Sequence, residues 1–255
     1  MAKIIAIVNQ KGGVGKTTTC VNLAAAVQEK GKLVLLCDFD PQANSTSGMG
    51  VDKTTSLGVY DVLINGTPPE KSVVHTRYAD VLPSSKALAG AGIEMTGMAQ
   101  REFLLKNALA VLAPQYDYIF IDCPPSLELL TLNALCAADS ILVPVQGEYY
   151  ALEGLSDLMN TVRIVRRSLN PALTLEGVLL TMFDSRTNLA MQVAEEVKRY
   201  FPGKVYGTVI PRNVRLSEAP SHGKPITAYD RSSRGAEAYL LLADELLRTN
   251  GGGAG

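Results

Sequence analysis

A glycine-rich stretch near the N-terminus, NQKGGVGKTTT (9–19), contains the residue types that bind phosphate. An apolar run (3–10) precedes it and a helical pattern (17–31) follows it. Glycines let backbone amides turn toward phosphate oxygens, and the N-terminus of a helix adds partial positive charge. Lys16 suits the β- and γ-phosphates and the Thr17 hydroxyl suits Mg²⁺. The stretch therefore predicts a nucleotide site.

The loop contains a second lysine that phosphate binding alone does not require. Lys11 stands where the usual motif has its first glycine. It is either a solvated lysine at the edge of a loop or a second cation for a phosphate group. The residues that we assign to the nucleotide phosphates are Lys11, Gly12, Gly13, Val14, Gly15, Lys16, Thr17 and Thr18.

Three aspartates follow predicted strands. Asp38 and Asp40 occur in LLCDFDPQAN, and Asp122 ends the apolar run IFID. Parallel sheets bind ligands beyond the carboxyl ends of their strands, where the phosphate loop also lies. A single aspartate there is often only a turn residue. Three of them on that edge predict carboxylates that hold Mg²⁺ and act in hydrolysis.

Apolar runs alternate with helical patterns along the chain. This alternation predicts an α/β fold, a doubly wound and mostly parallel sheet with helices on both faces. Residues 1–249 are expected to form one domain, followed by a flexible glycine-rich tail (250–255). The predicted strands are 3–10, 32–40, 78–84, 116–125, 140–146, 173–184 and 203–211, and the predicted helices are 17–31, 101–112, 126–138, 151–169, 189–201 and 235–248.

Composition restricts the function classes. The 255 residues are 47% hydrophobic and the net charge is −1, so binding to nucleic acid requires a local basic patch. No run is apolar enough for a membrane span. Four scattered cysteines without a C-x-x-C pair are expected to be reduced core residues: Cys20, Cys37, Cys123 and Cys136.

Five stretches in this order resemble the ParA/Soj chromosome-partitioning ATPases: KGGVGKTTT, CDFDPQANST, DYIFIDCPPS, LTMFDSRTNL and VIPRNVRLSEAPSHGKPI. The first is typical of the deviant Walker A class, which also includes MinD and the nitrogenase iron protein. The last two point to ParA/Soj in particular. The resemblance extends from Lys3 to about Leu247.

The resemblance implies roles for the loop and the aspartates. In similar proteins two protomers enclose two ATP molecules, and Lys11 would reach the phosphates of the partner. A cation supplied by a partner couples phosphoryl transfer to assembly. Lys11, Lys16 and Asp40 would be catalytic, with Asp40 orienting or activating the attacking water. Thr17, Asp38 and Asp122 would form or support the Mg²⁺ site.

The base site is expected at Met182, Phe183, Pro211 and Asn213, in the two stretches that flank adenine in similar proteins. An apolar floor with one amide suits a purine, although Met182 and Phe183 are equally compatible with an ordinary core. ATP as the nucleotide therefore rests on the resemblance. The guanine-reading pattern Asn-Lys-x-Asp does not occur in the sequence.

The resemblance implies an ATPase that segregates DNA. The ATP-dependent homodimer would bind double-stranded DNA non-specifically, and a ParB-type centromere-binding protein would stimulate hydrolysis and release. The protein would be cytoplasmic and nucleoid-associated, without stable membrane association. A MinD-like membrane ATPase is the alternative, but the predicted last helix is acidic opposite its apolar side. A redox relative would need paired cysteines, which Cys123 and Cys136 do not provide.

The DNA-binding residues are expected at Arg186 and Arg215, which follow predicted strand ends by a few residues. Similar proteins use basic residues in these segments for non-specific binding, which relies on phosphate contacts. Arg163, Arg166 and Arg167 at the end of a predicted helix are the alternative patch.

Overall fold

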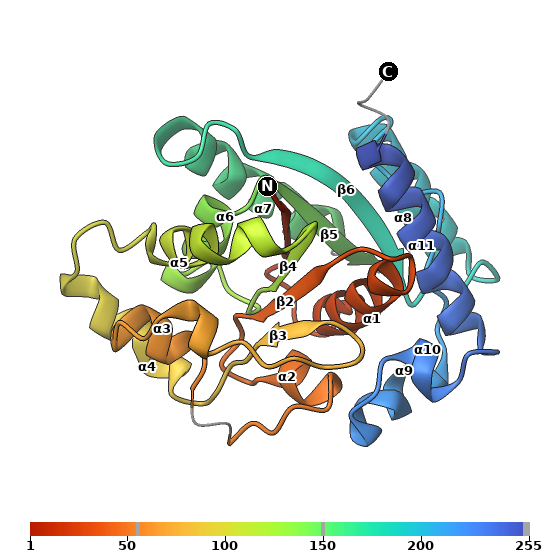
Figure 1. Ribbon diagram of the computed structural model, residues 1–255. Helices are drawn as coiled ribbons and strands as arrows, with labels where there is room; N and C mark the ends of the chain where they lie inside the picture. The colour runs from red at the N-terminus through yellow and green to blue at the C-terminus, as the bar shows by residue number, and fades with distance from the viewer. Residues whose placement is uncertain (55–56, 149–150, 252–255) are drawn as a thin grey trace.

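A computed structural model describes residues 1–54, 57–148 and 151–251 (Figure 1). One sheet with the strand order β3-β2-β4-β1-β5-β6 forms its centre. All neighbouring strands pair in parallel, which confirms the predicted fold class. The strands are β1 (Lys3–Ile7), β2 (Val34–Asp38), β3 (Asp80–Leu82), β4 (Tyr118–Asp122), β5 (Ser140–Gln146) and β6 (Thr174–Thr181).

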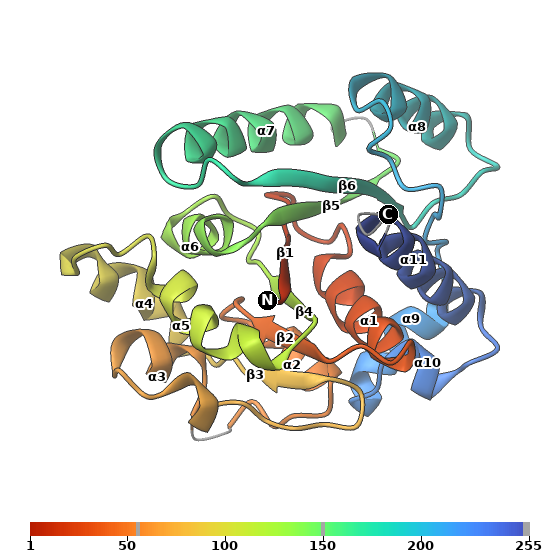
Figure 2. The same ribbon diagram turned by 45° about the horizontal axis from the view of Figure 1, so that its top comes forward.

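Helices cover both faces of the sheet. On one face the core contains residues of α1, α9, α10 and α11. On the other face it contains residues of α3, α4, α5, α6, α7 and α8 (Figure 2). The α-helices are α1 (Lys16–Glu29), α2 (Asn44–Gly48), α3 (Val59–Ile64), α4 (Leu88–Glu94), α5 (Leu104–Leu112), α6 (Leu129–Ala137), α7 (Ala151–Ser168), α8 (Asn188–Tyr200), α9 (Val214–Glu218), α10 (Ile226–Tyr229) and α11 (Arg234–Gly251), and the short 3-10 helices are η1 (Pro69–Lys71), η2 (Met95–Gly97), η3 (Ala113–Gln115) and η4 (Ala219–His222).

The strands read as continuous apolar runs because both faces of the sheet are buried. In β4, Ile119 and Ile121 enter one core while Tyr118 and Phe120 enter the other. Every residue of β2 and β4 is buried. This double burial fixes the strand ends, and with them the aspartates that follow the apolar residues.

Helix α1 lies between the sheet and α11 (Figures 1 and 2). The burial explains its composition of small and apolar residues after the phosphate loop. Tyr239 of α11 is fully buried against it, and its hydroxyl lies 3.2 Å from the Thr19 hydroxyl. Packing of α11 therefore holds the helix whose N-terminus forms part of the nucleotide site.

The predicted strand at 203–211 is wrong. This segment runs alongside β6 but does not form a continuous strand. Isolated bridges pair Val205 with Val178 and Pro211 with Phe183. Pro211 has no amide hydrogen, and Gly207 and Thr208 donate their amides to Glu245 of α11. The segment therefore has too few free donors for a continuous ladder.

The chain end also differs from the prediction. Helix α11 continues to Gly251, so the first two residues of the expected tail (250–255) are helical. Residues 252–255 lie outside the described residues.

Sequence analysis also missed short helices, namely α2, α3, α4, α9 and α10, because four to seven residues show too little periodicity.

The contact between β6 and the 203–211 segment requires a glycine. A Cβ atom at Gly177 would lie 2.6 Å from the Tyr206 ring and 3.2 Å from the Lys204 carbonyl oxygen. Gly177→Ala should therefore lower the free energy of unfolding by about 1–3 kcal/mol, measured by urea denaturation. Gly92→Ala is the control, because a Cβ there would meet nothing within 4 Å. Equal stability of the two variants would contradict this packing.

Candidate functional site

The loop between β1 and α1 lines a hollow, called the phosphate hollow below. Gly13 and Gly15 adopt left-handed φ angles of 75° and 87°, which turn the chain at the helix N-terminus. The Lys16 ammonium is buried and donates a 2.9 Å hydrogen bond to the Lys11 carbonyl oxygen. The hollow has a volume of about 350 Å³ and is lined by Gly12, Gly13, Gly15, Lys16, Thr17, Thr18, Asp40, Gln42, Asn44, Pro125 and Met182.

Asp38 and Asp122 are opposite each other at the ends of β2 and β4, as the strand register pairs them. Hydroxyl groups of α2 hold both carboxylates. Ser45 donates to Asp122 Oδ2 at 2.6 Å, and Thr46 donates its amide and its hydroxyl to Asp38 Oδ2, both at 2.7 Å. Helix α2 is therefore attached to the carboxyl edge of the sheet through the two aspartates.

Burial dominates the electrostatics of these carboxylates. Both side chains are inaccessible to solvent, and this burial raises the pKa of each well above its usual range. The Asp38 charge raises the pKa of Asp122 further, and hydrogen bonds from Ser45 and Thr17 oppose the rise. Burial lowers the pKa of Lys16, while the negative charge of Asp122 raises it. Additional positive charge here would favour the ionised carboxylates.

The oxygen atoms around Asp122 suit Mg²⁺. Asp122 Oδ1 is buried and has no hydrogen-bond partner among the described residues, and the Thr17 hydroxyl contacts the same carboxyl group. Mg²⁺ prefers one or two carboxylates together with hydroxyl, water and phosphate oxygens. Within the described part of the chain no group of three metal-binding side chains occurs, which is compatible with such a sparse site.

The two aspartates of the DFD sequence occupy different places. Asp40 lines the phosphate hollow, and its Oδ1 accepts a 2.9 Å hydrogen bond from the Gln42 amide. Asp38 is not among the residues that line this hollow, and its oxygens accept from Thr46 and from the Asp40 amide. Asp40 is thus placed to act on a ligand in the hollow. Asp38 instead holds the backbone of Asp40 and of Thr46 in place through hydrogen bonds.

Lys11 points away from the phosphate hollow. Its ammonium forms an ion pair with Glu148, just after β5, and it lines a separate hollow of about 300 Å³ together with Glu153 and Asp157 of α7. Its side chain is 38% exposed, compared with the buried Lys16. One loop therefore presents its two lysines to two different surroundings.

Another hollow, of about 340 Å³, adjoins the phosphate hollow. Gly15, Thr18 and Met182 line both of them. The predicted base residues Met182, Pro211 and Asn213 line it, but Phe183 is not among its lining residues. The residues that sequence analysis missed are Thr181, Ile210, Arg212, Leu216, Ser217, Pro220 and Tyr239. A larger hollow of about 920 Å³ along α11 contains none of the phosphate-loop residues.

Both predicted DNA-binding arginines are exposed and already paired with carboxylates. Arg186 contacts both oxygens of Asp184 at 2.8 and 2.7 Å, which lowers the pKa of Asp184 to about 2. Arg215 contacts Glu218 at 2.8 Å and Asp230 at 3.5 Å. Before a phosphate can bind, each arginine must leave its carboxylate or contact the carboxylate and the phosphate at the same time.

Other functional residues had weaker sequence signals. Ser45 and Thr46 follow the two aspartates within the stretch DFDPQANST, so a pair of hydroxyls near carboxylates was visible in the sequence. Glu148 is 137 residues from Lys11, and only the fold brings them together. All four cysteines are free and buried, as predicted, and burial raises the pKa of Cys136 to about 11.

The buried carboxylate pair predicts a pH-dependent stability. A folded-state pKa above the unfolded value means that the stability cost is absent below the unfolded pKa, grows as pH rises toward the folded pKa, and is complete above it. Asp122→Asn should therefore raise the melting temperature without nucleotide by about 2–4 °C at pH 8, and the gain should shrink toward pH 5. Calorimetry checks this, with the exposed Glu195→Gln as control. A gain that grows toward low pH would contradict the assignment.

Comparisons with known proteins identify the family of the chain. A family profile described as an AAA domain matches residues 2–175. The sporulation initiation inhibitor protein Soj of Bacillus subtilis is 61% identical over 249 residues, covering 96% of this chain and 98% of its own. The chromosome partitioning protein ParA of Myxococcus xanthus is 54% identical over 251 residues, covering 97% and 89%.

A solved structure shares the fold. Cobyrinic acid a,c-diamide synthase from Mycobacterium smegmatis, with bound ATP analog and magnesium, matches with a TM-score of 0.87 and 39% identity. The match covers 97% of this chain and 95% of that chain. Sequence motifs, site geometry and full-length relatives all lead to one conclusion. The chain belongs to the ParA/Soj family of chromosome-partitioning ATPases.

Proposed function

We propose that residues 1–249 form one ATPase domain that hydrolyses ATP to ADP and phosphate with Mg²⁺, as a nucleotide-dependent homodimer that moves DNA. The orientation of Lys11 is the observation that supports this best. Lys11 belongs to the phosphate loop yet lines a hollow beside α7 and not the phosphate hollow of its own chain. A lysine in this position can serve a phosphate group that a second protomer brings to it.

Each residue has a defined task in this mechanism. The loop amides and Lys16 bind the phosphates, and the partner's Lys11 adds positive charge to the transferred group. Asp40 lines the hollow, where its carboxylate orients the attacking water. Thr17 and Asp122 would hold Mg²⁺, which supplies charge neutralisation at the phosphates when bound. Met182, Pro211 and Asn213 would contact the adenine base.

The release of Lys11 from Glu148 is a necessary step in this proposal. Their ion pair is within one chain, so Lys11 must exchange Glu148 for a phosphate of the partner protomer. The exchange is inexpensive because both side chains are partly exposed, and such ion pairs contribute about 0–1 kcal/mol. Lys11 can therefore move from Glu148 to a phosphate of the partner protomer without unfolding of the loop.

The same proposal covers the DNA and the partner protein. The dimer would bind double-stranded DNA non-specifically through Arg186 and Arg215 and would act at the nucleoid in the cytoplasm. A ParB-type centromere-binding protein would stimulate hydrolysis. A membrane-bound alternative has less support, because α11 packs its apolar residues against α1 and the sheet. No helix in the described ranges is long and apolar enough to cross a membrane.

Mixing two inactive variants tests the lysine in trans. We expect Lys11→Ala and Asp40→Ala to hydrolyse ATP poorly when each is alone. A mixed dimer has one site with both Asp40 and a partner's Lys11, so mixing should restore at most about one quarter of wild-type turnover, the share expected for random two-fold pairing. Phosphate release measures it.

Protomers with both Lys11→Ala and Asp40→Ala are the control, because their mixture with Lys11→Ala contains no Lys11 and should restore no activity. If the Lys11→Ala and Asp40→Ala mixture is inactive while sedimentation detects mixed dimers, Lys11 acts within its own chain and the proposed dimer mechanism fails.

Gly12 provides a second test of the dimer. A Cβ atom at Gly12 would meet nothing within 4 Å, and its φ is not left-handed, so the monomer does not require a glycine here. Two phosphate loops that meet face to face would require one. Gly12→Val should bind ATP but sediment as a monomer with ATP. An ATP-dependent dimer of Gly12→Val would reject this geometry.

A further inference from the structure

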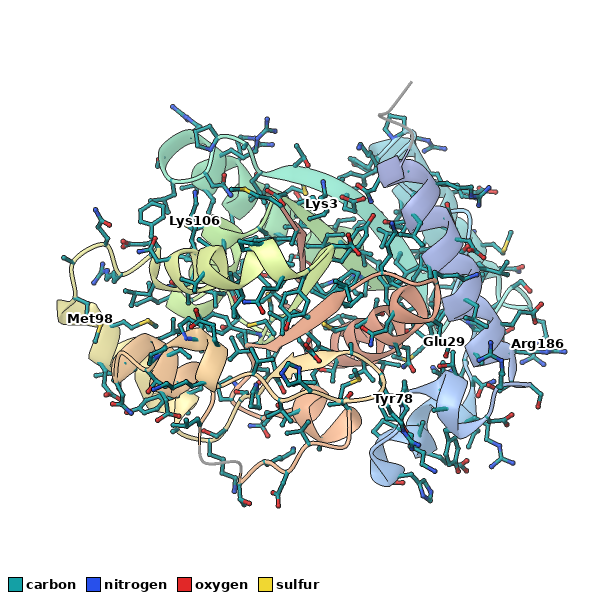
Figure 3. All side chains as sticks on the ribbon, in the orientation of Figure 1. Lys3, Glu29, Tyr78, Met98, Lys106 and Arg186 are labelled. Atoms are coloured by element: carbon teal, nitrogen blue, oxygen red, sulfur yellow. The ribbon has the colours of Figure 1, made fainter. Side chains whose placement is uncertain are left out.

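A hollow of about 600 Å³ lies between the loop before β3 and the chain that follows α9 and η4. It is separate from both nucleotide hollows. Figure 3 shows Tyr78, one of its lining residues, beside the α9 region. Its lining residues are Met49, Gly50, Val51, Asp52, Val74, His75, Thr76, Arg77, Tyr78, His222, Gly223 and Lys224.

Two cations of this hollow, Arg77 and Lys224, form no ion pair with a carboxylate of the described residues. Arg77 lies over the Tyr78 ring at 4.8 Å and donates to the Tyr78 hydroxyl. Lys224 makes no ion pair or side-chain hydrogen bond with the described residues. This contrasts with Arg186 and Arg215, which are both ion-paired within the chain.

The other ionisable groups of the hollow leave its charge positive. His75 is paired with Asp80 outside the lining, and His222 stacks on Tyr229 with ring centres 4.9 Å apart. Asp52 is the acidic residue in the lining, and its Oδ1 accepts hydrogen bonds from the amide and hydroxyl of Thr54, both at 2.8 Å. Two full positive charges therefore face one carboxylate even with both histidines neutral.

We propose that this hollow binds backbone phosphates of duplex DNA and extends the surface around Arg215. The inference rests on the DNA binding proposed above. An arginine fork and a lysine ammonium are the side chains that most often contact phosphate oxygens. An open hollow with cations and no base-reading pair suits contacts that are independent of sequence.

The hollow is continuous with the Arg215 region through direct contacts. Arg215 contacts Glu218, and the Tyr229 hydroxyl donates to the same Glu218 carboxylate at 3.2 Å. Tyr229 stacks on His222, which lines the hollow next to Lys224. Arg215 and the hollow therefore belong to one connected group of side chains, which one DNA duplex would contact.

The opposite wall of the hollow is connected to the nucleotide site. Residues 49–52 follow α2, whose Ser45 and Thr46 hold Asp122 and Asp38. A Cβ atom at Gly50 would lie 2.9 Å from the Gly223 carbonyl oxygen, so the two walls touch through glycines. A shift of α2 on nucleotide binding would thus change the hollow and with it the affinity of the hollow for phosphate.

Salt-dependent DNA binding tests the hollow in the ATP-bound protein. For Arg77→Ala with Lys224→Ala, we expect about a tenfold or larger loss of affinity for any duplex sequence. The slope of log affinity against log salt should become shallower by about 0.9 for each phosphate that the variant no longer neutralises. Lys224→Arg should retain the affinity, and ATP turnover without DNA should be unchanged. The matched control is Lys106→Ala on α5, far from Tyr78 (Figure 3).

The outcomes separate this inference from the proposed function. If the wild type binds DNA and Arg186→Ala or Arg215→Ala weakens binding, but the Arg77 and Lys224 variants match Lys106→Ala, the hollow is not a phosphate site. The same unchanged DNA affinity would be expected if the ligand of the hollow were an acidic protein segment and not DNA. If the wild type binds no duplex DNA with ATP, the proposed function and this inference both fail.

Discussion

Two aspartates at paired positions, Asp38 and Asp122, end neighbouring strands where neither carboxylate reaches water. Like charges in such a place repel each other and lose hydration. Ser45 and Thr46 reduce the cost by donating hydrogen bonds, and Lys16 lies close enough for its charge to act on Asp122. The phosphate loop, the two strand ends and α2 are therefore held in one electrostatic unit. The remaining structure positions that unit.

Function and stability conflict at this unit. A sheet edge closed by apolar residues would fold more favourably than one with two buried carboxylates. The chain keeps Asp122 with one oxygen that has no hydrogen-bond partner among the described residues, which is the arrangement that a cation would complete. Binding to the folded protein alone stabilises it by mass action, so Mg²⁺ and nucleotide can return the stability that the site removes.

The sequence predicted the parallel sheet and the phosphate loop because both depend on local patterns. Continuous apolar runs identified the buried strands, and glycines before Lys16 identified the loop. The segment 203–211 has a strand-like composition, yet Glu245 takes the amides of Gly207 and Thr208, a contact that no local pattern reveals. Glu148 was missed for the same reason. The ion pair of Arg186 is a local contact that the sequence does reveal, because Asp184 stands two residues before Arg186.

The raised proton affinity of the carboxylate pair has a thermochemical consequence. Without a cation the folded site holds a proton more tightly than an ordinary aspartate does. If Asp122 ligates Mg²⁺ as proposed above, ligation requires the ionised carboxylate, so binding of the magnesium–nucleotide complex would release protons to the buffer. The heat of binding then includes the ionisation enthalpy of that buffer. The site would thereby couple the nucleotide cycle to proton uptake and release, in addition to any protons from hydrolysis.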